Sequence, residues 1–190
     1  MKNKKRFIFI AAAIALFLSA AVITAITYLT PTENKISNEI SSETAQNNND
    51  YEAWIPEDFV VYDLDGNEVR LSDMKGKPVV INMWSSWCFA CTKELPDFES
   101  VFKEYGDSVT FMMINRTDGT KETMRSLTVF MQDKGYEFPV YCDTSGEAYR
   151  NLRVYGVPMT FFIDADGYIR YHVSDEITKE ELINAIENIL

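Results

Sequence analysis

Two cysteines, Cys88 and Cys91, stand three positions apart, the spacing at which two thiols on one helical turn can form a disulfide. They follow the apolar run Val79–Trp84, at a point where a buried strand would end and a helix would begin. A thiol at a helix start faces unpaired backbone N–H groups and the positive end of the helix dipole, which lowers its pKa. We therefore predict that Cys88 attacks substrate disulfides as a thiolate and that Cys91 resolves the mixed disulfide.

The same CxxC pair could instead be a chance pair in a core helix or half of a metal site. A zinc site would need two further ligands, and the only other cysteine and histidine are Cys142 and His172. The strand-to-helix context is what thiolate activation requires, so it favours redox chemistry. We expect neither a metal nor a cofactor, and we interpret Cys142 as a small buried hydrophobic residue.

The composition sets the broad class of the protein. With 190 residues, 46% of them hydrophobic, the chain is long enough for one domain with a buried core. All 29 acidic residues follow residue 30, whereas four of the 18 basic residues precede it, so the later part is strongly acidic. Because a negative surface repels phosphate groups, we expect no nucleic-acid partner.

The N-terminal segment has the pattern of a membrane anchor. Residues 1–6 are basic, and residues 7–29 carry no charge. A helix of that length spans a hydrocarbon core of about 30 Å, although small residues at Ser19–Ala21 leave cleavage as a signal peptide open. The basic flank predicts a single-pass protein of the cell membrane whose C-terminal part is extracytoplasmic. Residues 30–50, rich in Asn, Ser, Thr and Glu, predict a flexible linker, and residues 51–190 the folded domain.

Periodicity and turn signals predict an α/β domain with a mixed central sheet flanked by helices. The expected strands are Phe59–Asp63 and Glu68–Leu71 as a leading hairpin, Val79–Trp84, Val109–Asn115, Phe138–Tyr141, and Met159–Asp164 with Tyr168–Val173 as a second hairpin. The expected helices are Cys88–Tyr105, Thr120–Lys134, Ser145–Leu152 and Thr178–Leu190, the last with a capping box from Thr178 and Glu181.

From Trp54 to Leu190 the chain resembles the TlpA/ResA-like family of membrane-anchored bacterial thiol–disulfide oxidoreductases. The resemblance is carried by the segment Val79–Cys88, the Lys75–Lys77 loop, the inserted helix and strand at 120–141, and Gly156–Phe161. It implies a thioredoxin-like fold with an N-terminal hairpin and an inserted helix–strand unit. It also implies that disulfide-bearing proteins are the substrates.

The resemblance further assigns substrate contacts. It implies that Pro158 is a cis proline facing the CxxC motif and holds the backbone of Val157 open for strand-like hydrogen bonds to a substrate chain. Trp87, Phe89 and Ala90 surround the cysteines and are expected to contact the substrate as well. An ordinary turn proline is the alternative interpretation of Pro158. The pair Phe89–Ala90 departs from the common pattern, which has proline before the second cysteine, so the redox potential of the family is not carried over.

Glu94 matches the acidic residue that the family has three positions after the second cysteine. It lies one helical turn from Cys91, where a partly buried carboxylate could accept or deliver the Cys91 proton. A general thioredoxin has an aspartate where this chain has Asn82, which leaves Glu94 as the nearby candidate for that proton transfer. A solvated helix acid is the alternative. We expect a Gln replacement to change stability little, since it would lie on a partly exposed helix face.

The function that these observations favour is reduction of protein disulfides outside the cytoplasm. The resemblance suggests apocytochrome c or a methionine sulfoxide reductase as substrate, and a membrane thiol-transfer protein of the CcdA type as electron donor. One alternative is a Sco-type copper-binding module, but that type has three residues between its cysteines and a distant histidine, whereas this chain has two residues between its cysteines and His172 is only loosely placed. A peroxiredoxin is a further alternative; Ser85 stands three residues before Cys88, but the flanking proline is missing.

Overall fold

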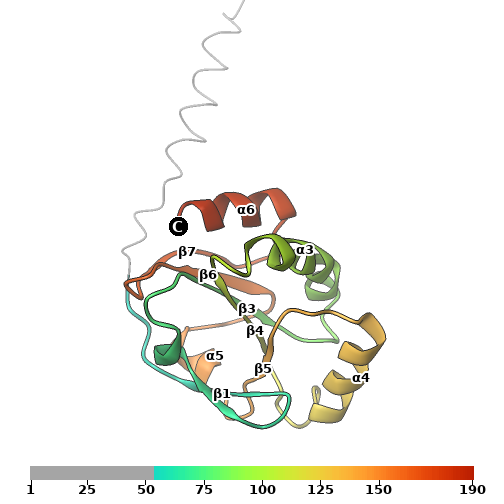
Figure 1. Cartoon of the computed structure of the whole chain (residues 1–190). Coiled ribbons are helices and arrows are strands. Elements are labelled where there is room, and N and C mark those ends of the chain that lie inside the picture. Colours follow the sequence, from blue (N-terminus) through green and yellow to red (C-terminus); the bar gives the residue numbers. More distant parts are fainter. Residues whose placement is uncertain (1–53) are drawn as a thin grey trace, which may run out of the picture. The chain divides into compact units, whose positions relative to one another are not determined.

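Six consecutive buried residues, Val79–Trp84, form strand β3 inside a seven-stranded sheet. The computed structural model describes residues 54–190 of the chain (Figure 1). A hydrophobic run without alternation is expected where both faces of a strand are covered. β3 pairs in parallel with β4 (Thr110–Asn115) and antiparallel with β6 (Met159–Ile163), so its C-terminal end is held on both sides.

The sheet is mixed, as the sequence predicts. Its strand order is β2-β1-β5-β4-β3-β6-β7; only the β3–β4 and β4–β5 pairs are parallel. The remaining strands are β1 (Val60–Asp63), β2 (Glu68–Arg70), β5 (Val140–Cys142) and β7 (Ile169–Val173). β1 and β2 form the expected N-terminal hairpin at one edge, and β6 and β7 form the second hairpin at the other edge.

Helices cover both faces of the sheet, and each face has its own core (Figure 1). Helices α3 (Phe89–Tyr105), α4 (Met124–Lys134) and α6 (Lys179–Glu187) pack on one face, where Val80 and Trp84 of β3 point. The short helix α5 (Glu147–Asn151) packs on the opposite face with Ile81 and Met83. The thioredoxin-like arrangement expected from the sequence is therefore confirmed.

Several helices and strands begin or end at other residues than the sequence predicts. α4 begins at Met124 rather than at Thr120, because Asp118 accepts hydrogen bonds from the N–H groups of residues 120–122 and Thr123 caps the helix. β5 begins at Val140 rather than at Phe138, since Pro139 has no N–H to donate. Leu71, predicted as the end of a strand, instead begins a short 3₁₀ helix that runs to Met74, and α6 ends at Glu187 rather than at Leu190.

The predicted cytoplasmic flank, anchor and linker, residues 1–50, lie outside the described residues. Within residues 54–190, no helix is both long enough and apolar enough to cross a membrane. The capping box predicted for the last helix is present, because Thr178 Oγ1 accepts from the N–H of Glu181 and the Glu181 carboxylate accepts from the N–H of Thr178.

Candidate active site

The turn between β3 and α3 carries both cysteines, which are joined as a disulfide with their Cα atoms 5.2 Å apart. Cys88 is the N-cap residue of α3, and its extended backbone places Sγ 3.2 Å from the N–H of Cys91, which donates to it. Cys91 is fully buried, whereas Cys88 keeps 8% of its surface exposed. A donor aimed at Sγ also stabilises a thiolate in the reduced form, so the geometry suits Cys88 as the attacking group.

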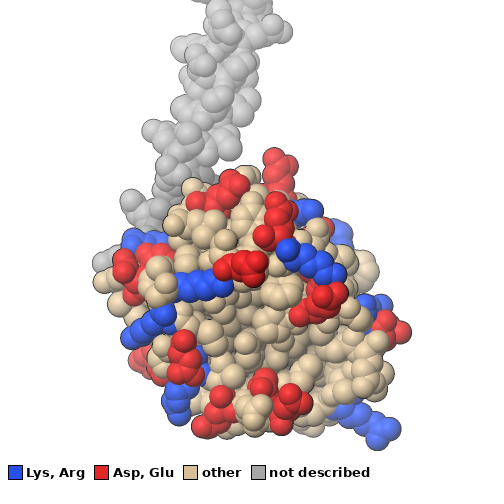
Figure 2. All heavy atoms as spheres, in the orientation of Figure 1, with Lys and Arg blue, Asp and Glu red and all other residues tan. Residues whose placement is uncertain are grey.

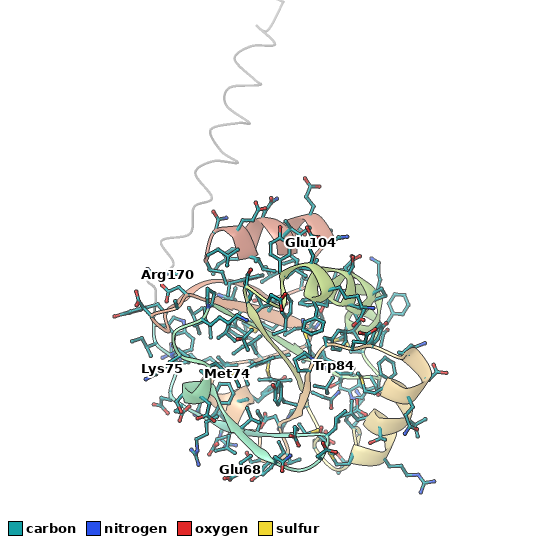
Figure 3. The ribbon with its side chains drawn as sticks, viewed as in Figure 1. Glu68, Met74, Lys75, Trp84, Glu104 and Arg170 are labelled. Atoms are coloured by element: carbon teal, nitrogen blue, oxygen red, sulfur yellow. A yellow bond between two sulfur atoms is a disulfide. The ribbon has the colours of Figure 1, made fainter. Side chains whose placement is uncertain are left out.

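Two aromatic residues flank the exposed edge of Cys88. Phe89 is 83% exposed and Trp87 is 45% exposed, while Ala90 is partly buried against the core. Trp84, labelled in Figure 3, is instead fully buried, and its ring packs against Phe130 with centroids 5.6 Å apart. A substrate approaching Cys88 would therefore meet Trp87 and Phe89, and Trp84 supports the turn from below.

The segment before β6 faces the disulfide. The peptide bond between Val157 and Pro158 is cis, as the family resemblance implies, and the carbonyl oxygen of Val157 lies 3.5 Å from Cys88 Sγ. Met159, the next residue, starts β6, which pairs with β3. The structure thus places Val157 beside Cys88, where the predicted substrate contact would have to be.

Glu94 lies behind the disulfide, one helical turn after Cys91, and is only 3% exposed. One carboxylate oxygen accepts a 2.8 Å hydrogen bond from Asn82 Nδ2, and the other accepts a 2.9 Å bond from the backbone N–H of Ile177. Asn82 Nδ2 also donates to Thr160 Oγ1 at 3.0 Å. The expectation of a partly exposed side chain is therefore wrong: the sheet and the segment before α6 close over Glu94.

Burial controls the acidity of this carboxyl group. Desolvation raises the pKa of Glu94 to about 7, against the opposing effect of its hydrogen bonds from Ile177 and Asn82. The nearby acidic side chains of Glu176 and Asp175 raise the pKa further. A carboxyl group with a pKa near neutrality can both take and return a proton at physiological pH. Glu94 can therefore serve the role that the sequence assigns to it.

The segment before α4 contributes two residues that sequence reasoning did not single out. Glu122 is fully buried and accepts hydrogen bonds from both the N–H and the Oγ of Ser86. Lys121 places its Nζ 3.3 Å from the ring centroid of Trp87. No motif marks either residue, since both belong to a polar stretch that reads as the start of a helix.

The packing of the other two candidate ligands, Cys142 and His172, accounts for each of them. Cys142 is a free thiol, fully buried in the core, and burial raises its pKa, as expected for a small hydrophobic residue. His172 stacks on Phe161, which belongs to the core on the α5 face, opposite the face that carries the cysteines. Within residues 54–190 no group of three or more His, Cys, Asp or Glu side chains is placed to hold a metal ion.

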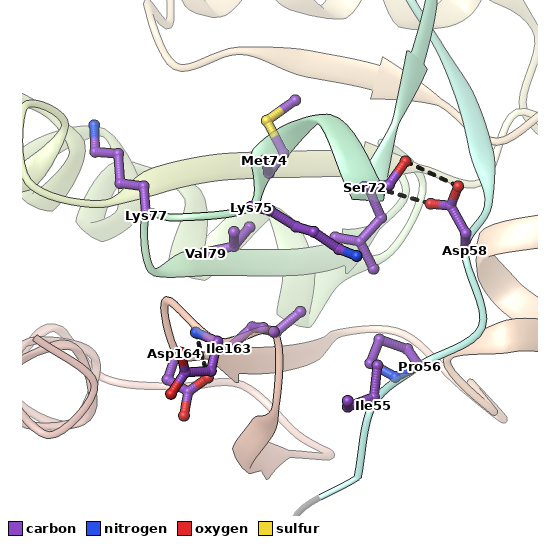
Figure 4. Close-up of a pocket in the computed structure, with 13 residues that line it drawn as sticks. Ile55, Pro56, Asp58, Ser72, Met74, Lys75, Lys77, Val79, Ile163 and Asp164 are labelled. Atoms are coloured by element: carbon purple, nitrogen blue, oxygen red, sulfur yellow. Dashed lines mark hydrogen bonds between the residues drawn. The ribbon is translucent and has the colours of Figure 1, made fainter.

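A cavity of about 130 Å³ lies at the other end of β3, beside Val79 rather than beside Trp84 (Figure 4). Its wall includes Ile55 and Pro56, and Ser72 there donates two hydrogen bonds to the Asp58 carboxylate. On the face shown in Figure 2, basic and acidic side chains are interspersed and form no patch of a single sign. Neither feature adds a residue to the active site.

Comparisons with known proteins agree with this geometry. The AhpC/TSA family matches residues 55–172. The thiol–disulfide oxidoreductase ResA of Bacillus thuringiensis subsp. konkukian is 33% identical over 131 residues, which are 69% of this chain and 74% of that protein. The solved structure of an exposed lipoprotein thioredoxin from Streptococcus pneumoniae superposes with a TM-score of 0.63 at 28% identity, over 70% of this chain and 99% of the other. StoA from Bacillus subtilis gives a TM-score of 0.61 at 25% identity, over 69% and 97% of the two chains. The chain therefore belongs to the AhpC/TSA family and is a thioredoxin-fold thiol–disulfide oxidoreductase of the ResA type.

Proposed function

We propose that this enzyme reduces disulfides of substrate proteins outside the cytoplasm, with Cys88 as the attacking thiolate and Cys91 as the resolving thiol. The observation that carries the proposal is the position of Cys88. Its Sγ accepts from the N–H of Cys91 at the start of α3, lies beside the carbonyl of Val157, and keeps the exposed surface that Cys91 lacks.

In the first half of the reaction the Cys88 thiolate attacks one sulfur of a substrate disulfide. A mixed disulfide forms, and the other substrate sulfur leaves as a thiolate and takes a proton from solvent. The N–H of Cys91 offsets the negative charge on Cys88 before attack. The exposed rings of Trp87 and Phe89 provide apolar contacts for the substrate chain, and the backbone of Val157 runs alongside it.

In the second half the Cys91 thiol must ionise in a buried position, which desolvation opposes. Glu94, one turn further along α3, accepts that proton as its pKa lies near 7. The Cys91 thiolate then attacks Cys88 Sγ and expels the second substrate thiolate. Two electrons have passed to the substrate, and the enzyme is left with the Cys88–Cys91 disulfide.

The N-terminal sequence and the family resemblance support one cellular setting for this reaction. The uncharged run 7–29 and its basic flank support a single-pass anchor in the cell membrane, with the catalytic domain on the extracytoplasmic side. A thiol-transfer protein of the CcdA type would then reduce the Cys88–Cys91 disulfide after each turnover. Apocytochrome c and a methionine sulfoxide reductase are the substrates that we propose.

The experiment is to trap substrates with Cys91→Ser in the native membrane. Without the resolving thiol, the mixed disulfide with Cys88 should persist, and its partner can be released with reductant and identified. Cys88→Ser serves as the matched control and should trap nothing. Equal trapping by both variants, or no adduct with any extracytoplasmic protein, would refute the proposal.

A further inference from the structure

A second buried carboxylate lies under the active-site turn. Glu122 has no exposed surface, and its oxygens accept from Ser86 N at 2.6 Å, Ser86 Oγ at 3.0 Å and Ser126 Oγ at 2.7 Å. Asn115 Nδ2 lies 3.4 Å away as a fourth donor. A buried carboxylate carries a large desolvation cost, which hydrogen bonds of this kind offset. Ser86 supplies two of these bonds and precedes Cys88 by two residues.

Lys121, the residue before Glu122, also contacts the active-site turn. Lys121 lies over the ring of Trp87, while Glu122 holds Ser86, so two consecutive residues of one loop hold the two residues before Cys88. Ser86 and Trp87 are the central residues of a turn that is closed by a 3.1 Å hydrogen bond from the N–H of Cys88 to the carbonyl of Ser85. The position of Cys88 Sγ therefore depends on the geometry of this turn.

The loop that carries these contacts is itself fixed at both ends. At its start, Asp118 Oδ1 accepts from the N–H groups of Thr120, Lys121 and Glu122 at 2.8–3.1 Å. These bonds, the one from Thr120 first among them, lower the pKa of Asp118 to about 2. At its end Thr123 caps α4. Glu122 is thus presented to Ser86 from a preformed loop.

We propose that Glu122 is a positioning residue for the exchange reaction: it fixes the turn Ser85–Cys88, so that Cys88 Sγ stays against the N–H of Cys91 and the carbonyl of Val157. The proposal rests on the dithiol exchange proposed above and adds a residue to it. An apolar side chain at this buried position would leave the N–H and Oγ of Ser86 without the acceptor that Glu122 provides. A carboxylate there satisfies the inward-facing N–H of Ser86 and sets the direction of the turn.

The test compares Glu122→Ala, Glu122→Asp and Glu122→Gln in the full-length chain carrying Cys142→Ala, so that only the active-site thiols remain. The measured quantity is the single-turnover rate at which the reduced enzyme reduces insulin disulfides, with the thermal midpoint recorded in parallel. Glu147→Ala is the matched control, since Glu147 also accepts a backbone N–H, from Val60, but on the α5 face of the sheet. Cys88→Ser gives the background rate.

We expect Glu122→Ala to slow insulin reduction by about tenfold or more, because a displacement of about 1 Å at a reacting centre can cost about 100-fold. Glu122→Asp, whose oxygens fall short of Ser86, should lose a similar factor; if the Ala variant does not fold, the Asp variant decides. Glu122→Gln can still accept from Ser86 N and should stay within about threefold of wild type, as should Glu147→Ala.

Three results would overturn the inference: a wild-type rate in Glu122→Asp, a loss in Glu122→Gln as large as in Glu122→Ala, or losses in the Glu122 and Glu147 variants that simply follow their thermal midpoints. A wild-type protein no faster than Cys88→Ser would instead refute the dithiol exchange itself. The two failures are therefore distinguishable.

Discussion

The carboxylate of Glu94 on α3 accepts a 2.9 Å hydrogen bond from the backbone N–H of Ile177, 83 positions further along the chain. The neighbouring residue Lys93 pairs with Glu176 in the same segment. Through Asn82, the other Glu94 oxygen is connected to β3 and to Thr160 of β6. A proton gained or lost at Glu94 therefore alters contacts to the sheet and to the segment that leads into α6.

Stability of the oxidised enzyme should fall as pH rises through the range in which Glu94 titrates. The folded pKa of Glu94, about 7, exceeds its ordinary value of 4.5, so the unfolded chain releases this proton first. Glu94 contributes up to about 3 kcal/mol to the free energy of unfolding. This contribution is fully present below about pH 4.5 and is lost as pH rises through 7. Urea unfolding at pH 4.5 and at pH 8 measures it.

Glu94→Gln is the control that isolates this effect, because Gln resembles the protonated acid and does not titrate. Asn82 Oδ1 has no hydrogen-bond partner in residues 54–190. When the Asn82 amide rotates so that this oxygen faces position 94, the oxygen can accept from the side-chain amide of the Gln. Wild type and variant should then be about equally stable at pH 4.5, with the variant more stable at pH 8. A constant difference between the two proteins across this range would contradict the raised pKa.

The same Glu94→Gln substitution should slow disulfide exchange. A positioned acid–base group typically contributes about 10²–10⁴-fold to a rate, so the mixed disulfide should persist at least about tenfold longer without the carboxylate. Loss of a nearby negative charge should also shift thiol alkylation to lower pH. Glu99→Gln on the same helix is the matched control, since Glu99 accepts from the backbone N–H groups of residues 137 and 138. Unchanged kinetics in Glu94→Gln would remove the proton-transfer role.

Local sequence was sufficient to predict the strand and the helix that carry the cysteines. Val79–Trp84 is a continuous apolar run, which both layers of the core require, and its predicted bounds are those of β3. α3 ends at Tyr105, immediately before Gly106, as the glycine stop signal indicates. Cys88 occupies the N-cap position, one residue before the helix proper. These features depend on neighbours in the chain, so they are visible in the sequence.

The surroundings of the disulfide could not be predicted in this way, because their partners are distant in sequence. Asn82 contacts Glu94 and Thr160, which lie 12 and 78 positions away, and the burial of Glu94 depends on Ile177. Glu122 was hidden because residues 120–123 were predicted as helix. The N–H groups of residues 120–122 bind Asp118 instead, that of Thr123 binds Ser126 Oγ, and this turn directs Glu122 inward.

The anchor and topology remain predictions from residues 1–29. If the basic flank stays in the cytoplasm and the uncharged run spans the membrane, protease added to intact protoplasts should remove the catalytic domain. Immunoblotting with an antibody against the C-terminal domain follows the loss, and a cytoplasmic protein is the control for lysis. Full protection of the domain would contradict the topology, and a mature N-terminus near residue 22 would contradict a retained anchor.

Cys88 should react with alkylating agents faster than Cys91, and with a pKa below the ordinary value of about 8.5. In the disulfide form the N–H of Cys91 donates to Cys88 Sγ, and Cys88 keeps an exposed edge that Cys91 lacks, so the same donor and access should serve the Cys88 thiolate after reduction. Alkylation of reduced Cys91→Ser and Cys88→Ser, each carrying Cys142→Ala, across pH 5–10 gives the two rate profiles separately. Denatured samples of both variants should react alike and serve as controls. If Cys91 proves the faster thiol throughout this range in the native proteins, the attacking and resolving roles are reversed.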